Sequence, residues 1–148
     1  MVGIATPVAG PNAMAGVEAG LDLGEVWAHA GMAIGPASDD QGSGYNSKIA
    51  AGLEIHGCGS SGVACLLIGV DLGGQHGKWN GDTTSDSFTG LVAIPRVFAD
   101  LGGSTWRFRV GLETSVLIAG TGTHGQVGVG RDSGVVGNEL VIGLARSW

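Results

Sequence analysis

The chain has 148 residues, 30 of them glycine, and a formal net charge of −6 at pH 7. Disorder is disfavoured, because disordered chains combine low hydropathy with high charge, whereas here the mean hydropathy is +0.28 and only 14 % of residues are charged. Seven basic residues argue against a nucleic-acid partner, which would need clustered positive charge. The length predicts one domain, residues 1–148.

The chain has no apolar run near the ~18–20 residues that a membrane helix needs. A membrane-spanning form could therefore only be a β-barrel. No basic residue precedes Lys48, so no secretory signal peptide with a positive start is expected. If the protein is exported, we expect this chain to be the mature part with an added initiator Met.

Alternation of large apolar residues with small or polar ones predicts strands along the chain. In the clearest segment, Leu112 lies on the apolar face, and Arg109 and Glu113 lie on the opposite face. Pro95 lacks an N–H to donate, which predicts a local bulge in its segment. The predicted strands, in chain order, are residues 2–8, 16–24, 26–34, 48–56, 64–73, 91–100, 106–119 and 135–148.

The predicted links between these strands alternate in length. Short links are expected at residues 24–25, 57–63 and 101–105. Longer ones are expected at residues 9–15, 36–46, 78–87 and 120–134. An even number of strands with alternating short and long links is typical of transmembrane barrels, which have short periplasmic turns and longer outer loops.

Residues 139–148 alternate to the end of the chain and finish on Trp148. This ending resembles the terminal strand of bacterial outer-membrane β-barrels, although Arg146 stands where that family has an aromatic or apolar residue. Together with the eight segments and the alternating links, the whole chain resembles the small OmpA/OmpX-type barrels. The resemblance is one of pattern and not of a sharp motif.

The predicted fold is an all-β, eight-stranded antiparallel transmembrane up-and-down β-barrel with a polar, side-chain-filled interior. The resemblance implies a place in the bacterial outer membrane, with both termini on the periplasmic side. It implies a structural, adhesive or surface-interaction role carried by the outer loops, and no open pore. The implied partners are membrane lipids or lipopolysaccharide, and the barrel-assembly machinery, which reads the last strand.

The same alternation separates an outward apolar face from a charged interior. Leu53, Leu72, Leu112 and Ile142 are expected to face lipid. We expect Arg107 and Arg109 to pair with acidic side chains, Glu139 being the best partner for Arg109 after a slippage of a few residues. Glu113 is the alternative, with Glu18 or Asp22 reached across the lumen. The interior charge network is predicted to contain Glu18, Asp22, Lys48, Glu54, Asp71, Arg96, Arg107, Arg109, Glu113 and Glu139. His29 and His56 add two titratable groups.

Aromatic residues fall near both predicted ends of the strands, as expected for interfacial belts. Trp27 lies at the right height, but its place in the alternation points inward. The predicted membrane-interface aromatics are Phe98, Trp106 and Trp148 at the periplasmic ends and Tyr45, Trp79 and Phe88 at the outer ends.

Cys58 and Cys65 are separated by six residues rich in glycine and serine. We expect a disulfide in a periplasmic turn, which an oxidising compartment would allow. The alternative is two unrelated buried thiols.

No cofactor or metal site is expected. Residues 120–125 match the glycine fingerprint of dinucleotide-binding folds, but the helix that must follow is not predicted. Asp82 and Asp86 lack the spacing of a calcium loop, so a solvated loop is the interpretation.

The chain is not expected to be an enzyme. Ser85, Ser87, His76 and His124 lie near the predicted outer rim, but no His-x-Ser pair or Gly-x-Ser-x-Gly nucleophile elbow is present. A lipid A-modifying hydrolase or acyltransferase remains one alternative. The other is a soluble, glycine-rich β-barrel that binds a small ligand or self-assembles.

Overall fold

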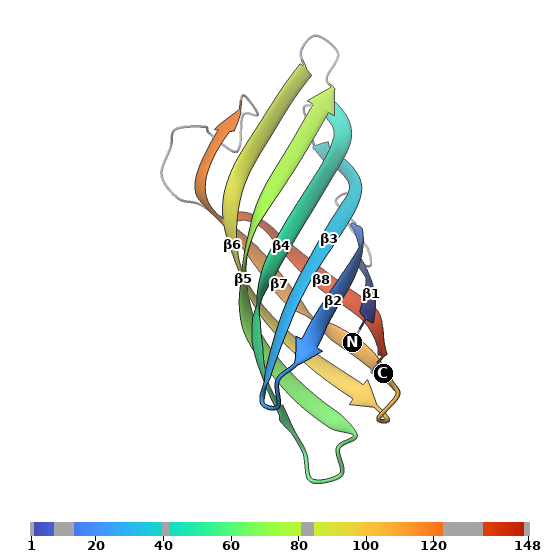
Figure 1. Ribbon diagram of the computed structural model, residues 1–148. Coiled ribbons are helices and arrows are strands. Elements are labelled where there is room, and N and C mark those ends of the chain that lie inside the picture. Colours follow the sequence, from blue (N-terminus) through green and yellow to red (C-terminus); the bar gives the residue numbers. More distant parts are fainter. Residues whose placement is uncertain (1, 8–13, 40–41, 81–84, 123–134, 147–148) are drawn as a thin grey trace.

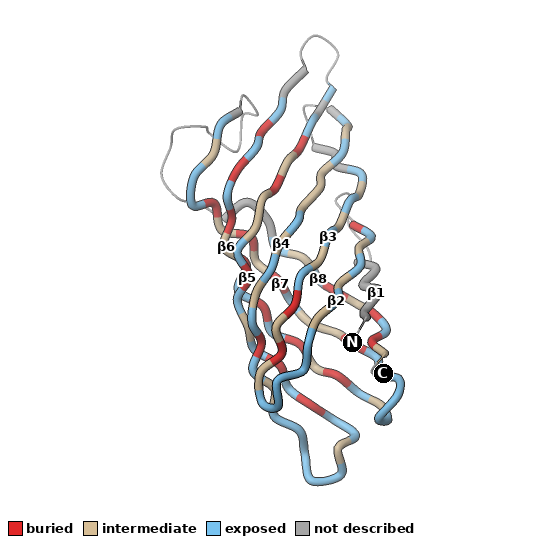
Figure 2. The backbone as a smooth tube through the Cα atoms, viewed as in Figure 1, coloured by how far each residue is buried: buried red, intermediate tan, exposed pale blue. Residues whose placement is uncertain are grey.

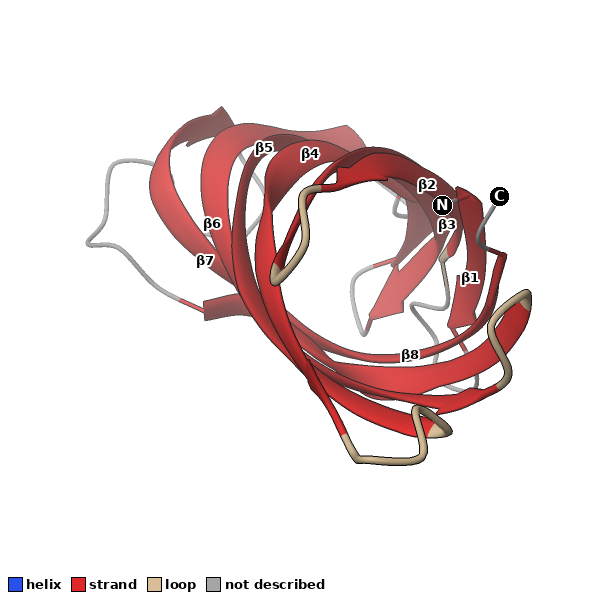
Figure 3. Ribbon diagram, turned by 60° about the horizontal axis from the view of Figure 1, so that its bottom comes forward, coloured by secondary structure: helices blue, strands red, loops and turns tan. Residues whose placement is uncertain are grey.

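The computed structural model describes residues 2–7, 14–39, 42–80, 85–122 and 135–146. Each strand pairs antiparallel with the next one along the chain, and β1 also pairs with β8. The sheet therefore closes into a barrel in the order of the sequence (Figures 1 and 3). The strands are β1 (Val2–Pro7), β2 (Ala15–Asp22), β3 (Val26–Asp39), β4 (Gly42–Cys58), β5 (Ala64–Asn80), β6 (Ser85–Gly102), β7 (Trp106–Gly122) and β8 (Val135–Arg146).

The all-β, antiparallel part of the prediction is confirmed. Within the described ranges, no helix has the length and hydropathy needed to cross a membrane.

The links at one end of the barrel are tight turns that the sequence specifies. Between β2 and β3, Gly24 has a φ of 98°, which a residue without Cβ adopts at little cost. The carboxylate of Asp22 accepts a hydrogen bond from Gly24 N at 2.9 Å, and Leu23 N donates to Val26 O at 2.8 Å. An Asp side chain that bonds the backbone two residues on is a common way to build such a turn.

Two of the predicted long links are wrong. Residues 36–46 and 78–87 are mostly strand, because β3 runs to Asp39, β4 starts at Gly42, β5 runs to Asn80 and β6 starts at Ser85. Figure 1 shows these four strands rising well beyond β2. The ladder needs only backbone groups, so small polar residues can pair there without the alternation that marks a strand with one apolar face.

The bulge predicted in the segment of Pro95 is present, but it lies before the proline. The register between β6 and β7 shifts at Leu91/Val92, and Pro95 itself pairs with Val70 of β5. On the side of β7, Ala93 pairs with Val116, and the next residue of β6 in the register is Arg96, which pairs with Glu113. Proline is therefore accommodated by a gap in the ladder on the side where its missing N–H would be needed.

Buried and exposed residues alternate along most strands (Figure 2). Leu112 is 60 % exposed, whereas Leu67 is 3 % and Ile94 1 % exposed. Leu53 and Leu72 are exposed as the alternation predicts, and Ile142 is half-buried. The outside of the barrel is thus apolar, which reverses the usual arrangement of a water-soluble barrel.

Among the described residues, two apolar clusters lie in the interior, with charged side chains on the same inward face between them. One cluster consists of Cys65, Leu67, Phe98 and Val141. The second, nearer the other end, consists of Val92, Ile94 and Leu117, with Ala50 packed against it.

The expected aromatic belts are only partly found. Tyr45 and Trp106 are exposed on the outer face, but Phe88 and Phe98 are buried at 2 % and 1 % exposure. Phe88 and Phe98 are buried because both lie on the inward face of β6 together with Arg96. The Trp79 side chain and Trp148 lie outside what the structure describes.

The expected disulfide between Cys58 and Cys65 is confirmed. The two cysteines face each other across the last pair of the β4–β5 ladder. The bond therefore closes the hairpin whose turn spans residues 59–63.

Replacing both cysteines by serine should leave the fold intact and lower the free energy of unfolding by ~2–3 kcal/mol, because the bond closes only a short loop. Urea unfolding of the refolded double variant measures this loss. The untouched chain, purified without reductant, should have the intact mass of the disulfide form. Two free thiols in that sample would contradict the prediction.

Candidate functional site

Arg96 on β6 is the hub of a buried ion-pair cluster. Its NH1 lies 2.6 Å from Glu18 Oε2 and 2.8 Å from Asp71 Oδ2, and its Nε lies 2.8 Å from Glu54 Oε1. The guanidinium thus contacts carboxylates from β2, β4 and β5 at once. Its side chain is only 3 % exposed, and a buried charge is tolerated only when it is paired in this way.

Arg109 on β7 forms the second part of the cluster. Its Nε and NH2 donate to the two carboxylate oxygens of Asp100 at 2.8 and 3.0 Å. Asp100 and Arg109 are direct partners in the β6–β7 register, so the strand pairing itself sets up this two-point contact. NH1 of Arg109 also lies 3.3 Å from Glu18, which links the two arginines through one carboxylate.

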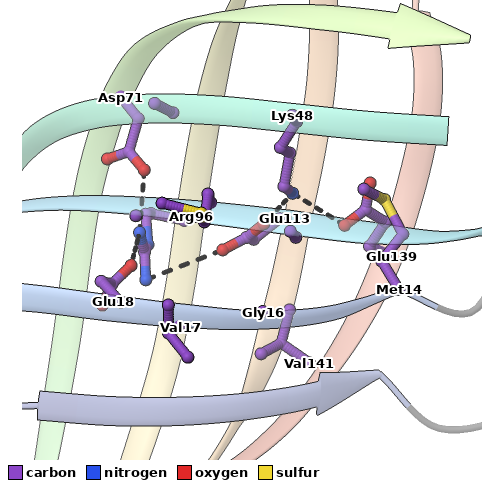
Figure 4. A pocket seen from close by; sticks show the side chains of 14 residues that line it. Met14, Gly16, Val17, Glu18, Lys48, Asp71, Arg96, Glu113, Glu139 and Val141 are labelled. Atoms are coloured by element: carbon purple, nitrogen blue, oxygen red, sulfur yellow. Dashed lines mark hydrogen bonds and ion pairs between the residues drawn. The ribbon is translucent and has the colours of Figure 1, made fainter.

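Lys48 on β4 forms the third part, shown with the hub in Figure 4. Its Nζ lies 2.5 Å from Glu113 Oε2 and 2.7 Å from Glu139 Oε2. The two glutamates are register partners on β7 and β8, so two like charges face each other directly. A lysine on β4, a strand that pairs with neither, offsets their repulsion.

His29 on β3 lies between two carboxylates of the cluster. Its Nδ1 is 3.3 Å from Glu18 Oε2, and its Nε2 is 3.3 Å from Asp71 Oδ1. The ring stacks on Trp27, with 4.6 Å between centroids. Packing against Trp27 therefore fixes the imidazole in a plane where each ring nitrogen meets a carboxylate.

The buried aromatic rings provide surfaces for the arginines. The Arg96 guanidinium carbon lies 4.5 Å from the ring centroid of Phe98. That of Arg109 lies 5.0 Å from Phe98 and 5.1 Å from Trp27. Cation–π contacts at these distances favour a desolvated guanidinium, and they explain why Phe98 belongs inside.

Glycines on the inward face give the charged side chains their room. A Cβ added at Gly69 would lie 2.6 Å from Cγ of Glu54, its register partner, and 2.5 Å from Leu53 O. A Cβ at Gly31 would lie 3.3 Å from Cβ of Glu18. Side chains at these positions would displace the carboxylates that hold Arg96.

The cluster contains more acidic than basic groups. Its cationic side chains are Lys48, Arg96 and Arg109, with His29 as a fourth titratable base, and its carboxylates are Glu18, Glu54, Asp71, Asp100, Glu113 and Glu139. The interior is therefore suited to cationic rather than anionic groups.

Glu18, His29 and Asp71 have ligand atoms within 4.8 Å of one another, the spacing of a metal site. However, NH1 of Arg96 lies against both carboxylates. A metal ion would have to displace the guanidinium, so this arrangement fits an ion pair better than a metal.

A cavity of about 60 Å³ lies beside the cluster, between the hub and the Lys48 group (Figure 4). Lys48, Arg96, Glu113 and Glu139 line it together with apolar Val141. A space of this size admits a few water molecules. The site can therefore hold water beside its charged side chains, in a small chamber whose lining is otherwise largely apolar.

Most of the residues predicted for the interior network meet in it, and two do not. Asp22 is exposed at the end of β2, where it caps Gly24. Arg107 is half-buried, and its guanidinium contacts the disulfide instead of an acid. Both lie closer than Asp100 to the end of the barrel that carries the tight turns. The members brought together are Glu18, Lys48, Glu54, Asp71, Arg96, Arg109, Glu113 and Glu139.

The predicted Arg109–Glu139 pair is wrong. The β7–β8 register shifts only between Ser115 and Val116, and this shift leaves Glu139 opposite Glu113 and Arg109 opposite Gly143. Arg109 instead pairs with Asp100 on β6, and Glu139 pairs with Lys48 of β4 across the lumen. The predicted network does not include Asp100. Asp100 shares the inward face of β6 with Arg96, and this alternation is the signal that could have identified it.

Of the polar residues near the predicted outer rim, His76 and Ser87 lie on the outward face of the barrel wall. His76 Nδ1 lies 2.8 Å from Thr89 Oγ1, and Nε2 lies 3.3 Å from Tyr45 OH. In the described part of the chain, these side-chain contacts of His76 involve no serine. His124 and the Ser85 side chain lie outside that part.

Compared with known protein families, with curated proteins and with solved structures, the chain matches none.

Arg96→Ala should lower the free energy of unfolding by ~3–5 kcal/mol, because it leaves Glu54 and Asp71 buried without their main partner. Lys78→Ala, which removes an exposed charge from β5, should change it by less than ~0.5 kcal/mol. Urea unfolding measures both variants.

Adding Glu54→Gln to Arg96→Ala should recover part of the loss, because it removes one stranded charge. Equal effects of Arg96→Ala and Lys78→Ala would show that the arginine is solvated and that the cluster does not hold the barrel together.

Proposed function

We propose that this chain is an eight-stranded transmembrane β-barrel of the bacterial outer membrane. The observation that carries the proposal is the reversed polarity of the sheet. Charged side chains are buried inside, and large apolar side chains cover the outside. Such a surface needs a nonpolar surrounding, because a soluble monomer rarely exposes an apolar area of this extent.

Closure of the sheet supports the same proposal. Lipid offers no hydrogen bonds, so a membrane-spanning sheet must satisfy its backbone groups internally and leave no edge. The pairing of β1 with β8 meets this requirement for the described strands. The buried ion pairs then fill the lumen, which favours a plugged barrel over an open pore.

The height of the apolar surface agrees with a bilayer. Along β5 the outward residues Leu66, Ile68, Val70 and Leu72 are all about half exposed, and His76 and Lys78 follow beyond Gly74. A tilted strand crosses the hydrocarbon layer in about 9–11 residues, close to the length of residues 64–74. The rings of Tyr45 and Trp106 lie near the two ends of this band.

The role we propose for the protein is structural, adhesive or surface-interacting. It is supported by the polar upper parts of β3, β4, β5 and β6, which continue past the apolar band towards residues 39–42 and 80–85 (Figure 1). They would stand above the outer leaflet, while the disulfide hairpin and both termini would face the periplasm. The proposed partners are membrane lipid or lipopolysaccharide around the barrel and the assembly machinery at β8.

The test is to express the chain behind a secretion signal in a Gram-negative host and to fractionate the membranes. The proposal expects it in the outer-membrane fraction, in a form that needs detergent to stay monodisperse and that shifts in mobility on denaturing gels only after boiling. A protein that is monodisperse without detergent would instead support a soluble barrel that binds a ligand or self-assembles.

Leu112→Arg should lower the stability of the barrel in lipid vesicles by ~2–4 kcal/mol, because it places a cation near the centre of the hydrocarbon layer. Leu101→Arg, nearer the end of the band, should cost only ~0–1 kcal/mol. Reversible urea unfolding in vesicles measures both. Equal costs at the two positions would contradict the membrane placement.

A further inference from the structure

Arg107, which is not part of the interior ion-pair cluster, lies against the disulfide hairpin. NH1 of Arg107 contacts Sγ of Cys65 and lies 3.8 Å from Sγ of Cys58. NH2 of the same side chain donates to Gly62 O at 3.4 Å, in the hairpin turn. The guanidinium is therefore held against both sulfur atoms.

The positive charge of Arg107 is not cancelled by the nearest interior acid. Asp100 is the register partner of Cys65, but both of its oxygens are bound by Arg109. Asp22 lines the same cavity of about 120 Å³, and its carboxylate caps a backbone N–H in the β2–β3 turn. His56 also lines this cavity, together with Asp100 and Arg109, and its ring contacts Gly24 O.

The two sulfur atoms are differently accessible. Cys58 is exposed, whereas Cys65 is 5 % exposed and packs in the lower apolar cluster. An external thiolate can therefore reach Sγ of Cys58, and the sulfur that must leave is the one in contact with Arg107. A positive group beside a thiolate stabilises it, and a more stable leaving thiolate departs faster.

We propose that the Cys58–Cys65 disulfide is a thiol-exchange site for dithiols, in which Arg107 stabilises the departing thiolate of Cys65. A dithiol attacks Sγ of Cys58 with one thiolate, the S–S bond breaks, and its electron pair leaves on Cys65. The second thiol of the reagent then displaces Cys58 from the mixed disulfide. The protein gains two electrons and two protons, and the dithiol becomes a cyclic disulfide.

The hairpin can undergo this reaction without opening. Gly59 N donates to Ala64 O at 2.9 Å, and Gly62 N donates to Gly59 O at 2.8 Å. Gly102 N also donates to Val63 O at 2.8 Å, which ties the turn to the end of β6. These backbone bonds remain when the sulfurs separate, so reduction and reoxidation are expected to be reversible. The proposal does not depend on the protein's location.

The test measures how fast dithiothreitol reduces the refolded, oxidised full chain at neutral pH, with free thiols trapped by N-ethylmaleimide and counted by intact mass. Arg107→Ala should slow reduction about three- to tenfold, and Arg107→Lys should fall between it and the unchanged chain. Arg146→Ala is the matched control, because Arg146 lies at the same end of the barrel with its guanidinium over Trp106. It should leave the rate unchanged.

A second readout separates the chemical role of Arg107 from a structural one. In Cys58→Ser, the remaining Cys65 thiol should react with iodoacetamide several times more slowly once Arg107→Ala is added. With glutathione as a monothiol, peptide mapping should find the mixed disulfide on Cys58. Equal reduction rates in Arg107→Ala and Arg146→Ala, faster reduction in Arg107→Ala, or glutathione on Cys65 would each overturn the proposal.

Discussion

The ion pairs of Arg96 are the constraint on which the rest of the structure depends. A closed antiparallel sheet sends every second side chain into a narrow lumen. Once Arg96 points there, it cannot reach bulk water, and its charge must be met by carboxylates from other strands. Glu18, Glu54 and Asp71 supply them from β2, β4 and β5, and of these three strands only β5 pairs with β6. The hub therefore ties strands that do not pair directly.

The small residues and aromatic rings of the interior, and the apolar residues of the exterior, are consistent with that hub. Gly69 leaves the volume that Glu54 occupies, and the rings of Phe98 and Trp27 flank the two guanidinium groups. With the charged side chains of the cluster paired inside, the outward positions carry residues such as Leu53 and Leu112. Polar contacts in the lumen and an apolar exterior are thus two consequences of one alternation along each strand.

The sequence predicted which face a residue occupies better than it predicted what the residue meets there. Alternation put Arg109 and Glu113 inside and Leu112 outside, because a period of two depends only on local geometry. It did not reveal that Lys48 reaches Glu139 across the lumen, since that contact depends on how the closed sheet is sheared. It predicts loops for much of the upper parts of β3 to β6, because small polar residues that suit water on both faces of a sheet carry no alternating signal.

The most direct measurement of the central claim is the set of nuclear Overhauser effects between detergent acyl chains and methyl groups of the folded protein. The account predicts strong effects from acyl chains to Leu53, Leu72 and Leu112, and none to the buried methyls of Leu67, Val92 and Ile94. Acyl-chain contacts at the second set, or water contacts in place of acyl contacts at the first, would contradict the reversed polarity of the sheet.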